Sequence, residues 1–307
     1  MKVRVGFGLG TSACAGLGGD DLSSIVDGCE ELGWDSIWFS ERVAMDVPDP
    51  LAAMAFVAGR TRRLKFGPSV LVLPGRDPVL LAKELATIDQ LSGGRLVVAL
   101  GLGAAVPGVP QPMDRAEAAA RTDEAVALIK RLWAEDHVTH AGPFYPVHDL
   151  SLRPPPVQRP HPDVWFGGHS RAAARRVGRL GDGWLPSFVT PREYRARADV
   201  ARDAAASAGR EIDEEHFGAL VAYVPENAAA DPGPVIDVFA ARRPDVPAEE
   251  IIVMDGHDGL RRHLEVFVEQ GASKFVVVPL VAPADWGDEL QALRETVARP
   301  LESTPPG

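Results

Sequence analysis

A glycine-rich segment near the middle of the chain has the residue types of a phosphate-binding turn. Gly167 and Gly168 follow a short apolar run, and His169 and Ser170 stand just before a helix-like stretch that begins at about Arg171. Two glycines let a ligand approach the backbone closely. The free N–H groups of a helix start, together with the Ser170 hydroxyl, can hold a phosphate. The segment therefore predicts a phosphate cradle; the alternative is a plain glycine turn in which Ser170 only caps the helix.

A carboxylate and a guanidinium follow a second apolar stretch. Ser40, Glu41 and Arg42 come directly after residues 34–39, which are mostly apolar. Glu41 could accept a hydrogen bond from the N–H of a heterocycle, and Arg42 could orient a substrate or balance its charge. The two side chains could instead pair with each other and do nothing more. We take Glu41 and Arg42 as the candidate catalytic residues.

Three other chemistries have weaker support. The sequence contains neither the metal motif H-E-x-x-H nor the hydrolase motif G-x-S-x-G, so we expect no metal site and no nucleophilic hydrolysis. Residues 8–13 match the dinucleotide fingerprint G-x-G-x-x-A, which requires a helix to begin at once. Residues 15–19 read AGLGG instead. We therefore expect this loop to form a wall of a substrate pocket, with a dinucleotide-binding fold as the alternative.

Strand-like and helix-like segments alternate along the chain and must position these residues. Asp49-Pro50 and Asp77-Pro78 each mark a helix start, because Asp caps free N–H groups and Pro suits the first helical position. Asp114 with Glu117 resembles a capping box. The predicted strands cover 3–9, 34–39, 64–73, 95–100, 164–167, 183–188, 217–224 and 274–278. The predicted helices cover 21–32, 50–60, 78–92, a long stretch after 114, 171–180, a stretch from 191, 259–270 and 288–298.

Eight strand–helix units with nearly continuous apolar strands predict an α/β fold of the (β/α)8 TIM barrel type. A segment at about residues 140–162 is rich in proline and aromatic residues and shows no helical period. We expect it to be an insertion, such as a hairpin, rather than a linker between domains. The sequence thus predicts a single barrel domain over residues 1–301 and a disordered tail over residues 302–307.

A barrel of this kind gathers the loops that follow its strands on one face. The strand ends concerned are 8–10, 40–42, 69–70, 101–103, 167–170 and 184–187. Three of them are glycine-rich, including the one with Gly101 and Gly103, which predicts a cofactor that lies against the backbone. Trp184 could line the same pocket, although aromatic side chains often serve packing only.

Composition excludes several classes of function. Among 307 residues, 46% are hydrophobic and 24% are charged, which are ordinary globular values. The net charge of −11 without a basic cluster argues against nucleic acid or an anionic membrane as partner, and no apolar run approaches the about 20 residues that cross a bilayer. The chain opens without a signal-peptide pattern and has only Cys14 and Cys29. We expect a reduced, cytoplasmic protein whose partner is a small molecule.

Longer stretches of the sequence resemble a known family. LGWDSIWFSER, DEAVALIKRLW, RPPPVQRP, VWFGGHS and GDGWLPSF are similar to the bacterial-luciferase-like superfamily, and more narrowly to its deazaflavin-dependent (coenzyme F-420) oxidoreductases. RTRRLKFGPSVLVLPGRDPVLLAKELA and GRLGDGWLPSFVTP resemble the branch that is usually assigned to coenzyme F-420 rather than FMN. The matching text covers nearly the whole predicted barrel.

The resemblance implies where a cofactor would bind. Members that use F-420 have a bulge in the third strand, with a non-proline cis peptide that supports the deazaflavin ring; the matching bond is Ser69–Val70. They place the phosphate-containing tail at the Gly-Gly that corresponds to Gly167–Gly168. The candidate cofactor-binding residues are Ser40, Ser69, Val70, Gly101, Gly103, Gly167, Gly168, His169, Ser170 and Trp184. Relatives are commonly dimers, so a homodimer is expected.

The resemblance also implies an activity. We expect an oxidoreductase that transfers a hydride between coenzyme F-420 and a small organic substrate, mainly by holding the two in position. The alternatives are an FMN-dependent monooxygenase that uses oxygen and a reductase partner, and a deazaflavin-binding protein without turnover. The substrate pocket is expected from residues 11–20, 104–113 and Phe144–Tyr145.

The chain departs from the family at the expected reacting centre. Several members have Asp-His where this chain has Glu41-Arg42, and some have Glu where it has Ala104-Ala105. The carboxylate carries over, but the role of the histidine does not. Sugar-phosphate dehydrogenation by the pattern of those relatives is therefore not expected.

Overall fold

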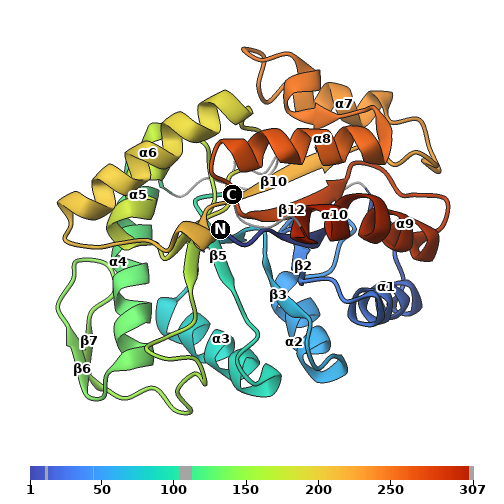
Figure 1. The fold of residues 1–307 in the computed structure, drawn as a ribbon. Coiled ribbons are helices and arrows are strands. Elements are labelled where there is room, and N and C mark those ends of the chain that lie inside the picture. The colour runs from blue at the N-terminus through green and yellow to red at the C-terminus, as the bar shows by residue number, and fades with distance from the viewer. Residues whose placement is uncertain (11–12, 44, 104–112, 304–307) are drawn as a thin grey trace.

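A closed barrel of parallel strands forms the centre of the molecule. The computed structural model describes residues 1–10, 13–43, 45–103 and 113–303, and Figure 1 shows helices surrounding the strands. The barrel strands are β1 (Arg4–Leu9), β2 (Ser36–Phe39), β3 (Lys65–Pro68) with β4 (Leu71–Val72), β5 (Val98–Gly101), β8 (Val164–Phe166), β9 (Gly183–Trp184), β10 (Gly218–Tyr223) and β12 (Lys274–Pro279). Two parallel sheets are joined into one ring by the bridges Phe66–Leu96 and Trp184–Phe217. The α/β class and the (β/α)8 barrel are confirmed.

The surrounding helices follow the predicted alternation. They are α1 (Gly19–Leu32), α2 (Pro50–Arg60), α3 (Pro78–Ser92), α4 (Arg115–Ala134), α5 (Arg171–Leu180), α6 (Pro191–Ser207), α8 (Gly256–Glu269) and α9 (Trp286–Leu293). The carboxylates of Asp49 and Asp77 each accept from two backbone N–H groups, as their Asp-Pro starts predict. Because α1 begins only at Gly19, no helix start follows the fingerprint at residues 8–13, and the dinucleotide-binding alternative is wrong.

The predicted capping box of α4 forms only in part. The Asp114 carboxylate accepts from two backbone N–H groups, at 2.8 Å each. The side chain of Glu117 pairs with Arg121 at 2.8 Å, one turn along the helix. In a capping box, the Glu117 carboxylate would accept from the backbone N–H of Asp114. Here that carboxylate pairs with Arg121 instead.

Two tryptophans fill the barrel interior. Trp38 and Trp165 are buried with their ring centroids 6.5 Å apart, and Trp38 Nε1 donates to Ser36 Oγ at 2.9 Å. Glycines on other strands provide the room: a Cβ on Gly67 would lie 2.8 Å from the Trp38 ring, and one on Gly183 would lie 2.4 Å from the Trp165 ring. This inner layer supports the strand ends that form the site.

The predicted insertion is a hairpin on the outside of the barrel. It consists of β6 (Val138–His140) and β7 (Val147–Leu150), which pair antiparallel beside α4 (Figure 1). Glu124 of α4 accepts from the backbone N–H groups of Phe144 and Tyr145. The predicted hairpin is confirmed. These hydrogen bonds to Glu124 hold it against α4.

Two parts of the chain differ from the prediction. Residues 225–255 carry α7 (Gly233–Ala240) and β11 (Ile252–Val253), where no element was predicted; β11 extends the sheet beside β10. At the C-terminus, a π-helical turn (Arg294–Ala298) leads into α10 (Arg299–Ser303). Glu302 accepts from Val5 N and pairs with Arg294 at 2.6 Å, so residue 302 is held against the barrel and is not disordered. Residues 304–307 lie outside the described residues.

Candidate active site

A hollow opens at the carboxyl ends of the barrel strands. Its lining consists of Gly10, Ser40, Arg42, Ser69, Ser187, Phe188, Leu220, Ala222, Phe239, Val278, Pro279 and Leu280. Its free space is about 460 Å³ with the mouth included, and the centre of a water molecule can reach about 60 Å³ of that space. The barrel therefore brings Ser40, Arg42 and Ser69 together. The expected pocket residues 11–12 and 104–112 lie outside the described residues, and Phe144–Tyr145 lie on the outer hairpin instead.

Two polar atoms in the hollow are buried without a hydrogen-bond partner among the described residues. They are Arg42 Nε and Ser69 Oγ. Burial lowers the pKa of Arg42, and the charge of Arg242 lowers it further. A buried polar group without a partner costs about 1–3 kcal/mol, and such groups in native proteins are commonly satisfied by a ligand or water. Arg42 and Ser69 therefore mark a place for a polar ligand.

Glu41 serves the neighbouring strand rather than Arg42. Its Oε2 accepts from Val72 N at 2.5 Å, and its Oε1 pairs with Arg76 Nη2 at 2.5 Å. Arg76 Nε in turn donates to Val72 O at 3.1 Å. The Glu41–Arg42 pair that the sequence left open does not form. Both carboxylate oxygens are thus engaged in holding β4, which favours a positioning role for Glu41; its expected catalytic role stays a prediction.

The peptide bond between Ser69 and Val70 is cis, as the resemblance implies. The bond lies between β3 and β4, and Ser69 N donates to Phe39 O at 2.7 Å. The Val70 side chain lies against two glycines: a Cβ on Gly101 would lie 2.5 Å from Val70 Cγ2, and one on Gly167 would lie 2.8 Å from Val70 Cγ1. These glycines accommodate Val70, and their expected contact with a cofactor stays a prediction.

Gly103 lies against Val72 of β4 in the same way, two residues further along both segments. A Cβ on Gly103 would lie 2.6 Å from Val72 Cγ1, and Gly103 adopts φ +71°. The glycine-rich end of β5 is therefore shaped by the two valines of the bulged strand. At Gly101 and Gly103 the structure shows a close contact with the side chains of Val70 and Val72; the expected contact with a cofactor stays a prediction.

We expect Gly101→Ala to destabilise the fold by about 1–3 kcal/mol, because its new methyl group would overlap Val70. Adding Val70→Ala removes the overlapping atoms, so the double variant should be no less stable than Val70→Ala alone. Gly59→Ala is the matched control, since a Cβ there meets no atom within 4 Å. Urea unfolding followed by circular dichroism measures all four. Additive losses in the double variant would contradict this contact.

The predicted phosphate turn has the expected local structure. Gly168 adopts φ +89°, and Ser170 is the N-cap of α5, with its Oγ accepting from Ala173 N at 3.1 Å. Burial and the charge of Arg243 lower the pKa of His169. The turn thus presents a helix start that Ser170 caps and an imidazole whose charged form is disfavoured. Gly167, Gly168, His169 and Ser170 are not part of the lining of the hollow.

Trp184 does not line the hollow, which corrects its predicted role. Its side chain is fully buried and stacks on Tyr194 at 5.1 Å between ring centroids. Its Nε1 donates to Gly168 O at 3.0 Å. Trp184 therefore supports the glycine turn from within the core.

Residues 225–255 add site residues that the sequence reasoning missed. Phe239 of α7 lines the hollow and packs on Phe188, with ring centroids 5.3 Å apart. Arg242 lies over both rings. Arg243 is only 5% exposed; it pairs with Glu193 at 2.9 Å and donates to Phe188 O at 2.5 Å. The only available signal was the pair of adjacent arginines, in a segment without a strand–helix pattern.

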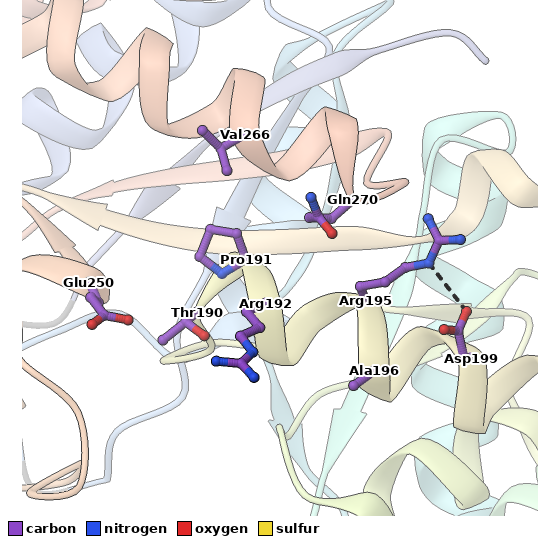
Figure 2. Close-up of a pocket in the computed structure, with 9 residues that line it drawn as sticks. All are labelled: Thr190, Pro191, Arg192, Arg195, Ala196, Asp199, Glu250, Val266 and Gln270. Atoms are coloured by element: carbon purple, nitrogen blue, oxygen red, sulfur yellow. Dashed lines mark ion pairs between the residues drawn. The ribbon is translucent and has the colours of Figure 1, made fainter.

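A second cleft lies on the outside of the molecule (Figure 2). It contains about 600 Å³ of space and is lined by residues of α6 and α8 together with Glu250. Arg195 and Asp199 of α6 form an ion pair at 3.5 Å within it. No residue of a barrel strand end lines this cleft, so the candidate active site is the hollow.

The structure also bears on three expectations, which concern metal sites, membrane spans and the two cysteines. Across residues 1–10, 13–43, 45–103 and 113–303, no group of three His, Cys, Asp or Glu side chains could hold a metal ion, and no helix is long and apolar enough to span a membrane. Cys14 and Cys29 are buried and unbridged, as expected. Burial raises the pKa of the Cys14 thiol to about 12, so this thiol stays protonated at neutral pH.

Comparison with known proteins gives relatives of two cofactor types. The chain is 36% identical over 175 residues to F-420-dependent glucose-6-phosphate dehydrogenase of Kineococcus radiotolerans (53% of this chain, 51% of that protein). It is 35% identical over 146 residues to FMNH(2)-dependent dimethylsulfone monooxygenase of Pseudomonas putida (46% of this chain, 40% of that protein). The chain thus matches about half or less of the length of these relatives.

The fold has close counterparts among solved structures. An F-420-dependent secondary alcohol dehydrogenase in complex with an F-420–acetone adduct superimposes with a TM-score of 0.80 at 19% identity, over 99% of this chain and 100% of that one. The family model of the luciferase-like monooxygenases matches residues 6–231, which include the strand ends 40–42, 69–70 and 167–170. The chain therefore belongs to the luciferase-like monooxygenase family.

Proposed function

We propose that the protein is an oxidoreductase that transfers a hydride between coenzyme F-420 and a small organic substrate. The observation that carries the proposal is the hollow at the strand ends, in which Arg42 Nε and Ser69 Oγ are buried without a partner among the described residues. These atoms suit a heterocycle rich in hydrogen-bonding groups. The relative from Kineococcus radiotolerans that is named for F-420 supports the choice of cofactor.

Each part of the site has a proposed task. When bound, the deazaflavin would supply the carbon that accepts or donates the hydride. The backbone and hydroxyl of Ser69, with Val70, would support the ring, and the N–H groups at the start of α5 with Ser170 would hold the phosphate. Arg42 would orient the substrate. Apolar walls such as Val278 and Leu220 would exclude water from the reacting atoms.

The narrow hollow sets a condition on this proposal. About 60 Å³ of it is within reach of the centre of a water molecule, so a tricyclic ring would occupy the mouth as well as the interior. A homodimer in the cytoplasm is part of the same proposal, and light scattering on the purified protein would measure the dimer.

The cofactor assignment has a direct test. We expect titration with coenzyme F-420, followed by its fluorescence, to give a dissociation constant at least about tenfold below that for FMN, a difference of about 1.4 kcal/mol. Anaerobic single turnover of the reduced cofactor with candidate acceptors then separates an enzyme from a carrier. Tighter binding of FMN would favour the alternative, an FMN-dependent monooxygenase, which the similarity to the dimethylsulfone monooxygenase supports.

A further inference from the structure

Two arginines at the hollow have no anionic partner. Arg42 lines the hollow, and Arg242 lies close enough that its charge lowers the pKa of Arg42. Across the described residues, neither guanidinium forms an ion pair or donates a hydrogen bond to a carboxylate, although the chain as a whole carries 43 acidic residues against 32 basic ones. Arg243, the next residue, is by contrast paired with both Glu193 and Asp245. Other arginines of the described residues also lack an ion pair, but Arg42 is the one that lines the hollow and has a buried nitrogen without a partner.

An apolar surface lies directly beside this pair of charges. The Arg242 guanidinium carbon is 5.7 Å from the ring centroid of Phe188 and 4.8 Å from that of Phe239. Both rings line the hollow. Cation–π contacts of this kind hold a guanidinium in place and leave its N–H edge available to another partner. The hollow thus has the cationic Arg42 and Arg242 next to the aromatic rings of Phe188 and Phe239.

Arg42 is partly buried, whereas Arg242 is exposed. Their like charges repel each other, and an anion placed between them would offset this repulsion and the lost hydration of Arg42. A planar carboxylate matches the donor fork of a guanidinium. We infer that the substrate of this site is an organic oxyanion, such as a carboxylate, whose charged group is bound by Arg42 and Arg242 and whose apolar part packs on Phe188 and Phe239. The inference deepens the proposed function and rests on it for the identity of the hollow as the substrate site.

The phosphate of the cofactor is the other source of such an anion. The turn that is proposed to hold that phosphate, residues 167–170, contributes nothing to the lining of the hollow. The start of α5 at Ser170 and the arginine pair are therefore separate places for negative charge. This separation favours the substrate as the occupant of the arginine pair.

The test compares benzoate with its neutral analogue benzamide, titrated into the full-length protein by calorimetry with and without bound coenzyme F-420. We expect benzoate to bind at least about tenfold more tightly than benzamide, and Arg242→Gln to remove that preference, since a charge-assisted hydrogen bond is lost. Arg42→Lys should also weaken benzoate binding. This second variant provides the test if Arg242→Gln does not fold. Arg192→Gln, an exposed arginine of the outer cleft, is the matched control and should change neither affinity.

The outcomes separate the two proposals. Equal affinity for benzoate and benzamide, or none for either, overturns the oxyanion inference. A loss of F-420 affinity in Arg242→Gln with unchanged benzoate binding also overturns it, because the cofactor would then supply the anion. A benzoate preference that depends on Arg242 in a protein that binds no F-420 would support the inference and contradict the proposed function.

Discussion

Replacing Glu289 with leucine should destabilise the protein by about 3–5 kcal/mol, the cost of removing one partner from a buried charged pair. Glu289 Oε1 accepts from Tyr223 Oη at 2.8 Å and lies 3.0 Å from His257 Nε2. The side chains of Glu289 and His257 are 3% and 8% exposed, and Tyr223 is fully buried. These three residues join β10, α8 and α9, so the loss of the carboxylate leaves a hydroxyl and an imidazole unsatisfied where water has no access. Urea unfolding measures the change.

An exposed ion pair on α8 provides the control for this result. Arg261 and Glu265 lie 2.8 Å apart, with 31% and 45% of their side chains exposed. Glu265→Gln should cost less than about 0.5 kcal/mol, because solvent already screens the pair. A loss below about 1 kcal/mol for Glu289→Leu would show that the buried network contributes little to stability.

The same network makes stability depend on pH in a stated direction. The hydrogen bond to Glu289 raises the pKa of His257, and nearby carboxylates raise it further. A pKa that is raised in the folded state means that protonation stabilises the fold. This contribution is complete below the unfolded value of about 6.5 and is lost as the pH rises through the folded value. The destabilisation by His257→Gln should therefore be larger at low pH than at high pH.

The barrel could be predicted because its signals are local. Asp49-Pro50 and Asp77-Pro78 specify helix starts by capping chemistry alone, and α2 and α3 begin there. Residues 225–255 offered no such signal, since β11 has two residues and depends on β10 for its pairing. Phe239 and Arg242 were missed for that reason: tertiary contacts, not periodicity, bring them to the hollow.

The orientation of single side chains at the site was harder to predict than the strand ends themselves. Trp184 lies on a strand of two residues, Gly183–Trp184, and a register error of one residue moves a side chain to the opposite face of a strand. Residues 167–168 were expected to touch a cofactor, but a glycine is equally required where another side chain fills the space. At Gly167 that side chain is Val70, which no sequence period could have indicated.

Glu41→Gln should both destabilise the protein, by about 1–3 kcal/mol, and weaken the binding of coenzyme F-420 by about tenfold, or about 1.4 kcal/mol. The carboxylate is 10% exposed and holds Val72 N and the Arg76 guanidinium with separate oxygens. An amide keeps one acceptor and turns a donor toward a neighbour that also donates. β4, which carries Val72, follows directly after Ser69 and Val70. A displacement of β4 should therefore also move these two residues, which are proposed to support the deazaflavin ring.

Arg76→Gln distinguishes positioning from direct contact, since Arg76 reaches Glu41 and Val72 O. If Glu41 acts through β4, Arg76→Gln should lower both stability and F-420 affinity, and the double variant should lose less than the sum of the single losses, because the two residues share one interaction. Fluorescence titration and urea unfolding on the four proteins give this coupling. Should Glu41→Gln abolish hydride transfer while Arg76→Gln leaves affinity and stability unchanged, Glu41 would instead touch the cofactor or substrate directly, and the positioning role derived from its two hydrogen bonds would be wrong.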